Sequence, residues 1–105
     1  KKYIMNYFEI KPNGEAYIRT DSGTVIRKVG NNESVNHAEF NKDESLFVIT
    51  YNSGKCEIRD RKNKLIEVIA EDGVKEAYFF QKEFNNKPNS SILSFNGEKI
   101  LIIKN

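Results

Sequence analysis

Short apolar runs recur along the chain, and turns rich in Gly, Asn, Asp and Pro separate them. No stretch combines the 3.6-residue apolar period of an amphipathic helix with helix start and stop signals. The turn residues supply the positive φ angles and local hydrogen bonds that chain reversals need. The pattern therefore predicts ten strands, over residues 3–10, 15–20, 24–29, 35–40, 45–51, 55–59, 64–70, 74–80, 90–95 and 98–104.

The residue types also favour an all-β fold. Ile, Val, Thr, Phe and Tyr together number 33, whereas Ala, Leu and Met together number nine. β-Branched and aromatic side chains suit a pleated, half-buried surface better than a helix. The 105 residues predict one domain, residues 1–105, with a single core and no room for a large enclosed active-site cleft.

The same sequence excludes several classes of protein. Cys56 is the one cysteine, so neither an intrachain disulfide nor a cysteine-rich zinc module can form. No apolar run approaches the ~20 residues of a membrane span, and no signal-peptide pattern opens the chain. We therefore expect a soluble, cytoplasmic protein without a membrane partner. The net charge of +2 is close to balance, and no basic block indicates a nucleic-acid tail.

An internal repeat organises the predicted strands. Residues 35–40 (V-N-H-A-E-F) and 74–79 (V-K-E-A-Y-F) share the pattern V-x-x-A-x-F, 39 residues apart. Residues 3–8 precede the middle copy by 32 residues and keep the Phe. Each copy continues with a polar turn, a β-rich run, a glycine turn (Gly23, Gly54 or Gly97) and another β-rich run. The predicted units span about 3–34, 35–73 and 74–105, a period typical of propeller blades.

The middle unit resembles a degenerate WD-repeat blade. Residues 38–45 (A-E-F-N-K-D-E-S) resemble the family's small-x-Phe, polar turn and return to strand, and residues 54–60 (G-K-C-E-I-R-D) resemble its Gly-x-x-x-Ile-Trp-Asp ending. Arg59 replaces the Trp, and no Gly-His pair precedes the unit. Because closed propellers have four to eight blades, the resemblance implies an open half β-propeller of three antiparallel sheets. The alternative is a β-sandwich or barrel.

Catalytic and metal-binding chemistry has little support in the sequence. His37 and Cys56 are the only soft metal ligands and fall on different predicted strands, whereas a zinc site needs three or four ligands. No serine has a G-x-S-x-G setting, and one histidine is available as a base. A basic cluster (Arg59, Arg61, Lys62 and Lys64) lacks the aromatic pattern of an RNA-binding sheet. We expect no enzymatic activity, metal, cofactor or nucleic-acid partner.

The predicted loops differ in charge. We expect one face of the blades to collect residues 21–23, 30–34, 52–54, 71–73 and 96–98. All charged residues of that face are acidic: Asp21, Glu33, Glu71, Asp72 and Glu98. The opposite face collects residues 11–14, 41–44, 60–63 and 81–89, with six basic and four acidic side chains. Turn chemistry explains part of this pattern, but an acidic face would also attract a basic protein and repel phosphate backbones.

These features predict a non-enzymatic inhibitor that binds a basic protein. Its small size, acidic face and half-propeller architecture are similar to those of immunity proteins of bacterial toxin systems. That resemblance implies that Asp21, Glu33, Glu71, Asp72 and Glu98 cover the basic cleft of a nuclease-type toxin. Exposed Tyr or Phe residues would anchor the interface. The alternative is a scaffold: a half-propeller that closes a six-bladed ring as a homodimer, or a segment of a longer propeller.

Overall fold

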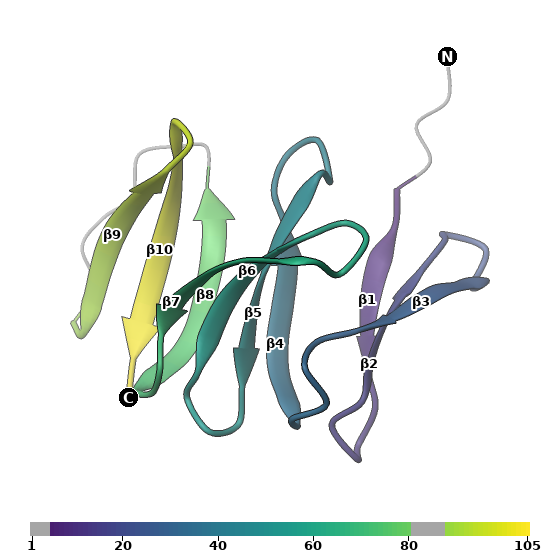
Figure 1. Ribbon diagram of the computed structural model, residues 1–105, viewed down its shortest axis with the longest axis horizontal. Coiled ribbons are helices and arrows are strands. Elements are labelled where there is room, and N and C mark those ends of the chain that lie inside the picture. The colour runs from purple at the N-terminus through teal and green to yellow at the C-terminus, as the bar shows by residue number, and fades with distance from the viewer. Residues whose placement is uncertain (1–4, 81–87) are drawn as a thin grey trace.

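The computed structural model describes residues 5–80 and 88–105, which form ten strands in three antiparallel sheets (Figure 1). The first sheet has the order β1 (Tyr7–Ile10), β2 (Ala16–Arg19), β3 (Val25–Val29). The second has the order β4 (Val35–Phe40), β5 (Leu46–Tyr51), β6 (Cys56–Asp60), β7 (Leu65–Ala70). The third has the order β8 (Val74–Phe80), β10 (Glu98–Lys104), β9 (Ser90–Phe95). The predicted all-β class, the ten strands and the three open antiparallel sheets are confirmed.

The second sheet lies between the other two, and both of its faces are buried (Figure 1). On β5, Phe47, Ile49 and Tyr51 pack toward the first sheet, whereas Val48 packs toward the third. A strand buried on both faces is apolar at consecutive positions rather than at alternate ones, which explains the unbroken run in β5. In the described part of the chain, no helix is long and apolar enough to cross a membrane.

In the pattern V-x-x-A-x-F, the Ala follows the Val by three positions, which would place the two side chains on opposite faces of a regular strand. A β-bulge in each copy accounts for this spacing. On β4 the register shifts between Val35 and His37, and on β8 it shifts between Val74 and Glu76. The extra residue lets the Val and the Ala share one face although three positions separate them. The two bulges also touch, because the side-chain amide of Asn36 donates to the carbonyl of Lys75 at 2.7 Å.

A second repeat joins the first and second sheets at a spacing of 40 residues. Residues 14–19 (G-E-A-Y-I-R) correspond to residues 54–59 (G-K-C-E-I-R). Arg19 pairs with Val25 and Arg59 with Leu65, each across a register shift after the preceding Ile. The strands β1, β2 and β3 are therefore the counterparts of β5, β6 and β7. The first sheet has no described counterpart of β4.

This correspondence shows that residues 3–8 are not equivalent to residues 35–40, as the predicted repeat had them. The sequence alignment matches Phe8 with Phe40, but Phe8 faces the second sheet and Phe40 faces the first. Their rings stack across the interface with centroids 4.4 Å apart. Because β1 corresponds to β5, the true counterpart of Phe8 is Val48, 40 residues later. Gly14, rather than Gly23, corresponds to Gly54.

The third sheet also departs from the expected continuation. Its order places β10 between β8 and β9, so the strands do not follow one another across the sheet. The Asn96-Gly97 hairpin forms as its sequence predicts, but it returns the chain to the centre of the sheet. The connection before it includes residues 81–87, which lie outside the described residues.

The outer face of the first sheet carries polar and charged residues that suit contact with solvent. On β5, the residues Phe47, Ile49 and Tyr51 are apolar or aromatic and buried. The residues 40 positions earlier, on β1 and just after it, are Tyr7, Glu9 and Lys11. Arg19 donates from Nε to Glu9 at 2.7 Å, and Lys28 lies 3.4 Å from Glu15. A face that packed against another sheet would leave such charged pairs desolvated.

Candidate binding groove

Hydrogen bonds between loops define the two ends of the molecule, named here from Figure 1. At the lower end, two backbone bonds join neighbouring sheets, from Val35 N to Gly14 O (2.9 Å) and from Val74 N to Gly54 O (3.0 Å). Two others extend strand pairs within a sheet, from Asn52 N to Ser34 O (2.8 Å) beside β4 and β5 and from Asn105 N to Gly73 O (3.0 Å) beside β8 and β10. The upper end is joined by Arg61 N to Ser45 O at 3.1 Å and by Asn41 Nδ2 to Glu98 Oε2 at 3.1 Å.

The structure does not bring the five predicted acidic residues together. Glu33, Glu71 and Asp72 lie at the lower end, whereas Asp21 and Glu98 lie at the upper end. The expected grouping is wrong because loops at the two ends of β3 must lie at opposite ends of an antiparallel sheet. Glu98 begins β10, which runs antiparallel to β8 and therefore starts at the upper end. No purely acidic face results, since Lys11 also lies at the lower end.

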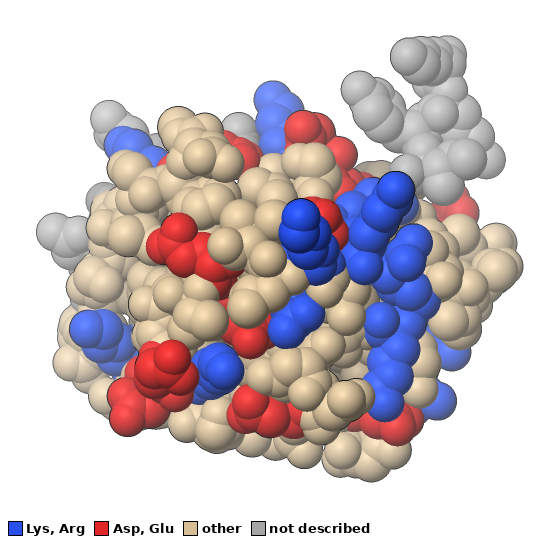
Figure 2. Space-filling view, in the orientation of Figure 1, with Lys and Arg blue, Asp and Glu red and all other residues tan. Residues whose placement is uncertain are grey.

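The basic cluster of the sequence is likewise divided. Arg59 is buried and donates to Glu57 at 2.8 Å, and Arg61 binds Glu44 at 3.3 Å. Lys62 and Lys64 are exposed. Figure 2 shows basic side chains gathered on the right of the molecule and acidic side chains along the lower edge. Two of the four clustered cations therefore serve internal contacts rather than a continuous cationic surface.

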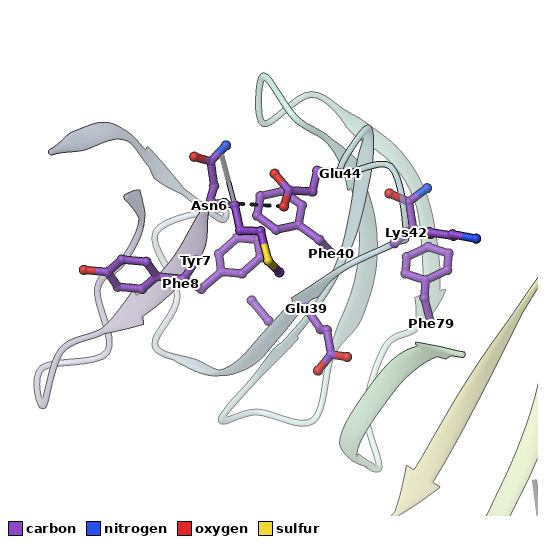
Figure 3. Close-up of a pocket in the computed structure, with 11 residues that line it drawn as sticks. Asn6, Tyr7, Phe8, Glu39, Phe40, Lys42, Glu44 and Phe79 are labelled. Carbon is purple, nitrogen blue, oxygen red and sulfur yellow. Dashed lines mark hydrogen bonds between the residues drawn. The ribbon is translucent and has the colours of Figure 1, made fainter. Parts of the chain in front are cut away.

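A groove of about 510 Å³ opens between the free edge of β1 and the strand β4 (Figure 3). Its floor is aromatic: the ring of Phe8 lies 4.4 Å from that of Phe40 and 5.1 Å from that of Phe47, centroid to centroid. Met5 borders the groove with 67% of its surface exposed. Figure 3 places Phe79 at the opposite side from β1. The groove therefore offers an open apolar surface rather than an enclosed cavity.

Of the two carboxylates beside the groove, Glu44 is paired with an arginine and Glu39 is not. Glu44 accepts from the backbone N–H of Asn6 at 3.4 Å and from Arg61 at 3.3 Å, so its carboxylate ties the β4–β5 turn to the start of β1. The guanidinium of Arg61 also lies 5.7 Å from the centre of the Phe40 ring. Glu39 has a side chain that is 43% exposed, and its Oε2 lies 3.6 Å from Nε2 of His37. Glu39 is thus the carboxylate available to an incoming cation.

A small titratable cluster lies beside the groove, between β4 and β8. The ring of His37 meets that of Tyr78 edge-on at 4.8 Å, and the Tyr78 hydroxyl donates to Glu76 at 2.6 Å. Nε2 of His37 is buried and has no hydrogen-bond partner among the described residues. This nitrogen therefore takes part in no nucleophile–base pair of the kind that serine or cysteine catalysis needs.

Tyr78 gives this cluster a measurable pH signature. Burial, the hydrogen bond to Glu76 and the nearby carboxylates raise the pKa of Tyr78 to about 12, from an ordinary 10.0. The folded state prefers the neutral phenol, so this stabilisation is complete below pH 10 and declines as the pH rises toward 12. We expect the free energy of unfolding, followed by urea denaturation, to fall less steeply over that range in Tyr78→Phe than in the wild type. Equal slopes would contradict this assignment.

The buried polar groups elsewhere are not accessible to a ligand. Cys56 is fully buried, and burial raises the pKa of its thiol to about 11, so the thiol stays neutral and unreactive at neutral pH. Within residues 5–80 and 88–105, no three His, Cys, Asp or Glu side chains come together as metal ligands. Glu57 is 1% exposed and is bound internally by Tyr51 and Arg59.

No family model matches the sequence, and a search of curated proteins finds no significant match. The groove therefore has to be interpreted from its own geometry. Sequence reasoning did not single out Phe8 and Phe40 as a site, because an aromatic residue in a strand is usually part of the core. The signal was the 40-residue repeat, which shows that no described strand lies beside β1 where β4 lies beside β5.

Proposed function

We propose that the chain is a non-enzymatic protein-binding domain of the inhibitor type. The observation that carries this proposal is the groove beside β1, where an aromatic floor and the exposed Met5 are open to solvent. Exposed apolar surface of this kind usually marks a site where another macromolecule docks. The described residues around the groove offer carboxylates and a lysine, but no paired nucleophile and base.

The half β-propeller interpretation fits the arrangement of the strands. The four strands β4 to β7 follow one another across their sheet, as in a propeller blade. The neighbouring sheets pack on its two faces, and the 40-residue correspondence relates β1–β3 to β5–β7 in the same chain direction. Under this interpretation the chain holds one four-stranded blade between two three-stranded ones.

A basic nuclease-type toxin remains the partner class that we propose, with the chain acting as its immunity protein. The charge argument now depends on Glu33, Glu71 and Asp72, which share the lower end, and on Glu39 beside the groove. Carboxylates on the inhibitor would steer a cationic surface into contact and raise the association rate. Asp21 and Glu98 lie at the other end, and Glu98 already accepts from Asn41.

Affinity capture with matched variants tests this function. The full chain is immobilised, and bound proteins from native extract are identified at moderate salt. One stoichiometric basic protein, whose nuclease activity the free chain inhibits, is the expected result. We expect the double variant Glu71→Lys, Asp72→Lys and the variant Met5→Asp each to weaken capture. Ile92→Asp, which also adds a carboxylate to an exposed apolar position, should not. Capture of no protein, or of proteins that show no inhibition, would refute the inhibitor function.

The scaffold alternative has one observation in its favour. The outer face of the third sheet carries Leu101, Ile103 and the 48%-exposed Ile92, which points away from the second sheet. A ring closed by two copies would, however, set this face against the polar outer face of the first sheet. The pair formed by Glu9 and Arg19 would then be desolvated. A monomeric mass in sedimentation velocity is therefore the expected result.

A further inference from the structure

The strands β3 and β7 form the outer edges of the first and second sheets, at the edges of these sheets opposite to β1 and β4. β1 and β4 contact each other beside the groove, whereas β3 and β7 are the last strands of their sheets. Figure 1 shows β3 and β7 on the side that faces the viewer. Asn63, in the β6–β7 turn, accepts from Gly30 N at 2.8 Å and donates to Gly30 O at 3.2 Å, just after β3. The two outer edges therefore share one side of the molecule.

Each outer edge exposes two aliphatic side chains, at positions 40 residues apart. Val25 and Ile26 on β3 are 45% and 37% exposed, and Leu65 and Ile66 on β7 are 44% and 42% exposed. A register shift in each strand leaves Ile26 and Ile66 as the extra residues of β-bulges. Because a bulge blunts an edge against pairing with another strand, these side chains are presented to something other than an added strand.

Basic residues flank both aliphatic pairs, and neither segment contains an acidic residue. Residues 24–29 (T-V-I-R-K-V) carry two cations, and residues 61–66 (R-K-N-K-L-I) carry three. We name these two segments together the rim surface. Figure 2 shows basic side chains gathered on this part of the molecule. The rim surface therefore sets exposed cations beside exposed aliphatic groups.

The two lysines of the β6–β7 turn are the cations that this surface offers to a ligand. Lys62 and Lys64 are exposed, and neither forms an ion pair with a described carboxylate. The neighbouring Asp60 instead accepts from their backbone N–H groups, each at 2.9 Å. Lys28 and Arg61 already lie 3.4 Å and 3.3 Å from carboxylate oxygens of other residues.

The side-chain types favour a lipid surface over a nucleic acid or a protein. Single-stranded nucleic acids are held largely by stacking on aromatic rings, and the rim surface has no aromatic residue. Protein interfaces depend on Trp, Tyr and Arg anchors, whereas Leu and Val are under-represented there. A membrane interface uses both features of the rim surface, because cations bind anionic headgroups while aliphatic side chains enter the acyl boundary.

We propose that the rim surface binds peripherally to a membrane that carries anionic lipids. Val25, Ile26, Leu65 and Ile66 enter the boundary between headgroups and acyl chains, and the turn lysines bind the headgroups. Peripheral binding needs no apolar span, so the expectation of no membrane partner, which followed from the lack of such a span, does not extend to it. The inference is independent of the proposed inhibitor function, since the groove lies beside β1 and β4.

Vesicle co-sedimentation of the full chain tests the contribution of charge. The vesicles contain phosphatidylcholine, alone or with about one third phosphatidylserine. We expect phosphatidylserine to increase binding about tenfold or more, and about 0.5 M salt to remove most of that increase. The double variant Lys62→Gln, Lys64→Gln should bind about tenfold more weakly. Its matched control, Lys99→Gln, Lys104→Gln on β10, removes the same charge at exposed positions and should lose about threefold at most.

Tryptophan fluorescence tests whether the aliphatic side chains enter the lipid, because the chain has no Trp of its own. The emission of Leu65→Trp and of Val25→Trp should shift to shorter wavelength when phosphatidylserine vesicles are added. Ile92→Trp, at a 48%-exposed position on β9, should show no shift. The double variant Leu65→Ser, Ile66→Ser should bind these vesicles about tenfold more weakly. Circular dichroism of each variant verifies its fold.

Three results would overturn the inference. The first is binding that does not depend on phosphatidylserine, or no binding at all. The second is an equal loss in the β10 control. The third is a loss in Lys62→Gln, Lys64→Gln without any emission shift or effect of Leu65→Ser, Ile66→Ser. That third result, with binding of polyuridylate at the same salt, would assign the lysines to a nucleic acid instead.

The two proposals can fail separately. Met5→Asp should leave vesicle binding unchanged, and Lys62→Gln, Lys64→Gln should leave capture of a protein partner unchanged. Vesicle binding without a captured partner would refute the inhibitor function and leave the lipid site standing. Capture and inhibition of a partner without vesicle binding would refute the lipid site alone.

Discussion

Replacement of Arg59 by Met is expected to lower the free energy of unfolding by about 3–5 kcal/mol, because it leaves a buried carboxylate without its closest cation. Glu57 is 1% exposed, and its Oε1 accepts from Arg59 Nε at 2.8 Å and from the Tyr51 hydroxyl at 2.5 Å. The other described cation is Lys55, 3.8 Å from Oε2. Urea denaturation followed by circular dichroism at pH 7 measures the loss.

The protonation states of Tyr51 and Arg59 depend on their common partner, Glu57. Burial alone would lower the pKa of Arg59, but its hydrogen bond to Glu57 and the charge nearby outweigh that effect and raise it. Burial and the hydrogen bond to Glu57 hold the pKa of Tyr51 well above its usual range. The folded state therefore keeps the guanidinium charged and the phenol neutral. A buried carboxylate in this setting depends on both donors.

The 40-residue repeat supplies a matched control for Arg59. Arg19 occupies the corresponding position, and its Nη1 donates to the carbonyl of Gly23 at 2.6 Å, much as Arg59 donates to that of Asn63 at 2.7 Å. Its partner Glu9 has a side chain that is 37% exposed. Arg19→Met should therefore cost at most about 1 kcal/mol. Similar losses in both variants would show that the carbonyl contact, and not the buried carboxylate, dominates.

The difference between these two arginines also shows what the sequence could predict. Both lie in the run G-x-[A/C]-x-I-R, so local pattern alone predicts two equivalent strands. Turn residues such as Gly23 and Gly54 bound the strands because their φ angles of 92° and 91° are costly for other residues. Local chemistry of this kind located the ten strands. It does not reveal which of the two arginines a neighbouring sheet will bury.

Long-range arrangement accounts for the predictions that failed. The Asn96-Gly97 turn predicts that β9 pairs with β10, which it does, but it does not indicate which of them lies beside β8. That choice places Glu98 at the upper end, away from Glu71. The groove likewise lies beside an edge of β1 with which no described strand pairs, and no local sequence pattern marks such an edge. Only the comparison of Gly14 with Gly54 indicates it.

Gly54→Ala is expected to destabilise the fold by about 2–4 kcal/mol, the second large effect. Gly54 has a φ of 91°, in the left-handed region that disfavours any side chain. A Cβ at this position would also lie 2.6 Å from the backbone nitrogen of Gly73. This close approach lets the Gly54 carbonyl accept from Val74 N at 3.0 Å, which joins the second and third sheets. The midpoint of urea denaturation measures the change.

Gly23→Ala separates the two contributions. Gly23 has nearly the same φ, 92°, and lies in a turn with the same two backbone hydrogen bonds, but a Cβ added there would meet no atom within 4 Å. It should therefore show the conformational cost alone, about 1–2 kcal/mol. The excess in Gly54→Ala then measures how firmly the turn of the second sheet is held against the third. Equal costs at both positions would mean that the close approach of Gly54 to Gly73 adds nothing to the stability of the contact between the second and third sheets.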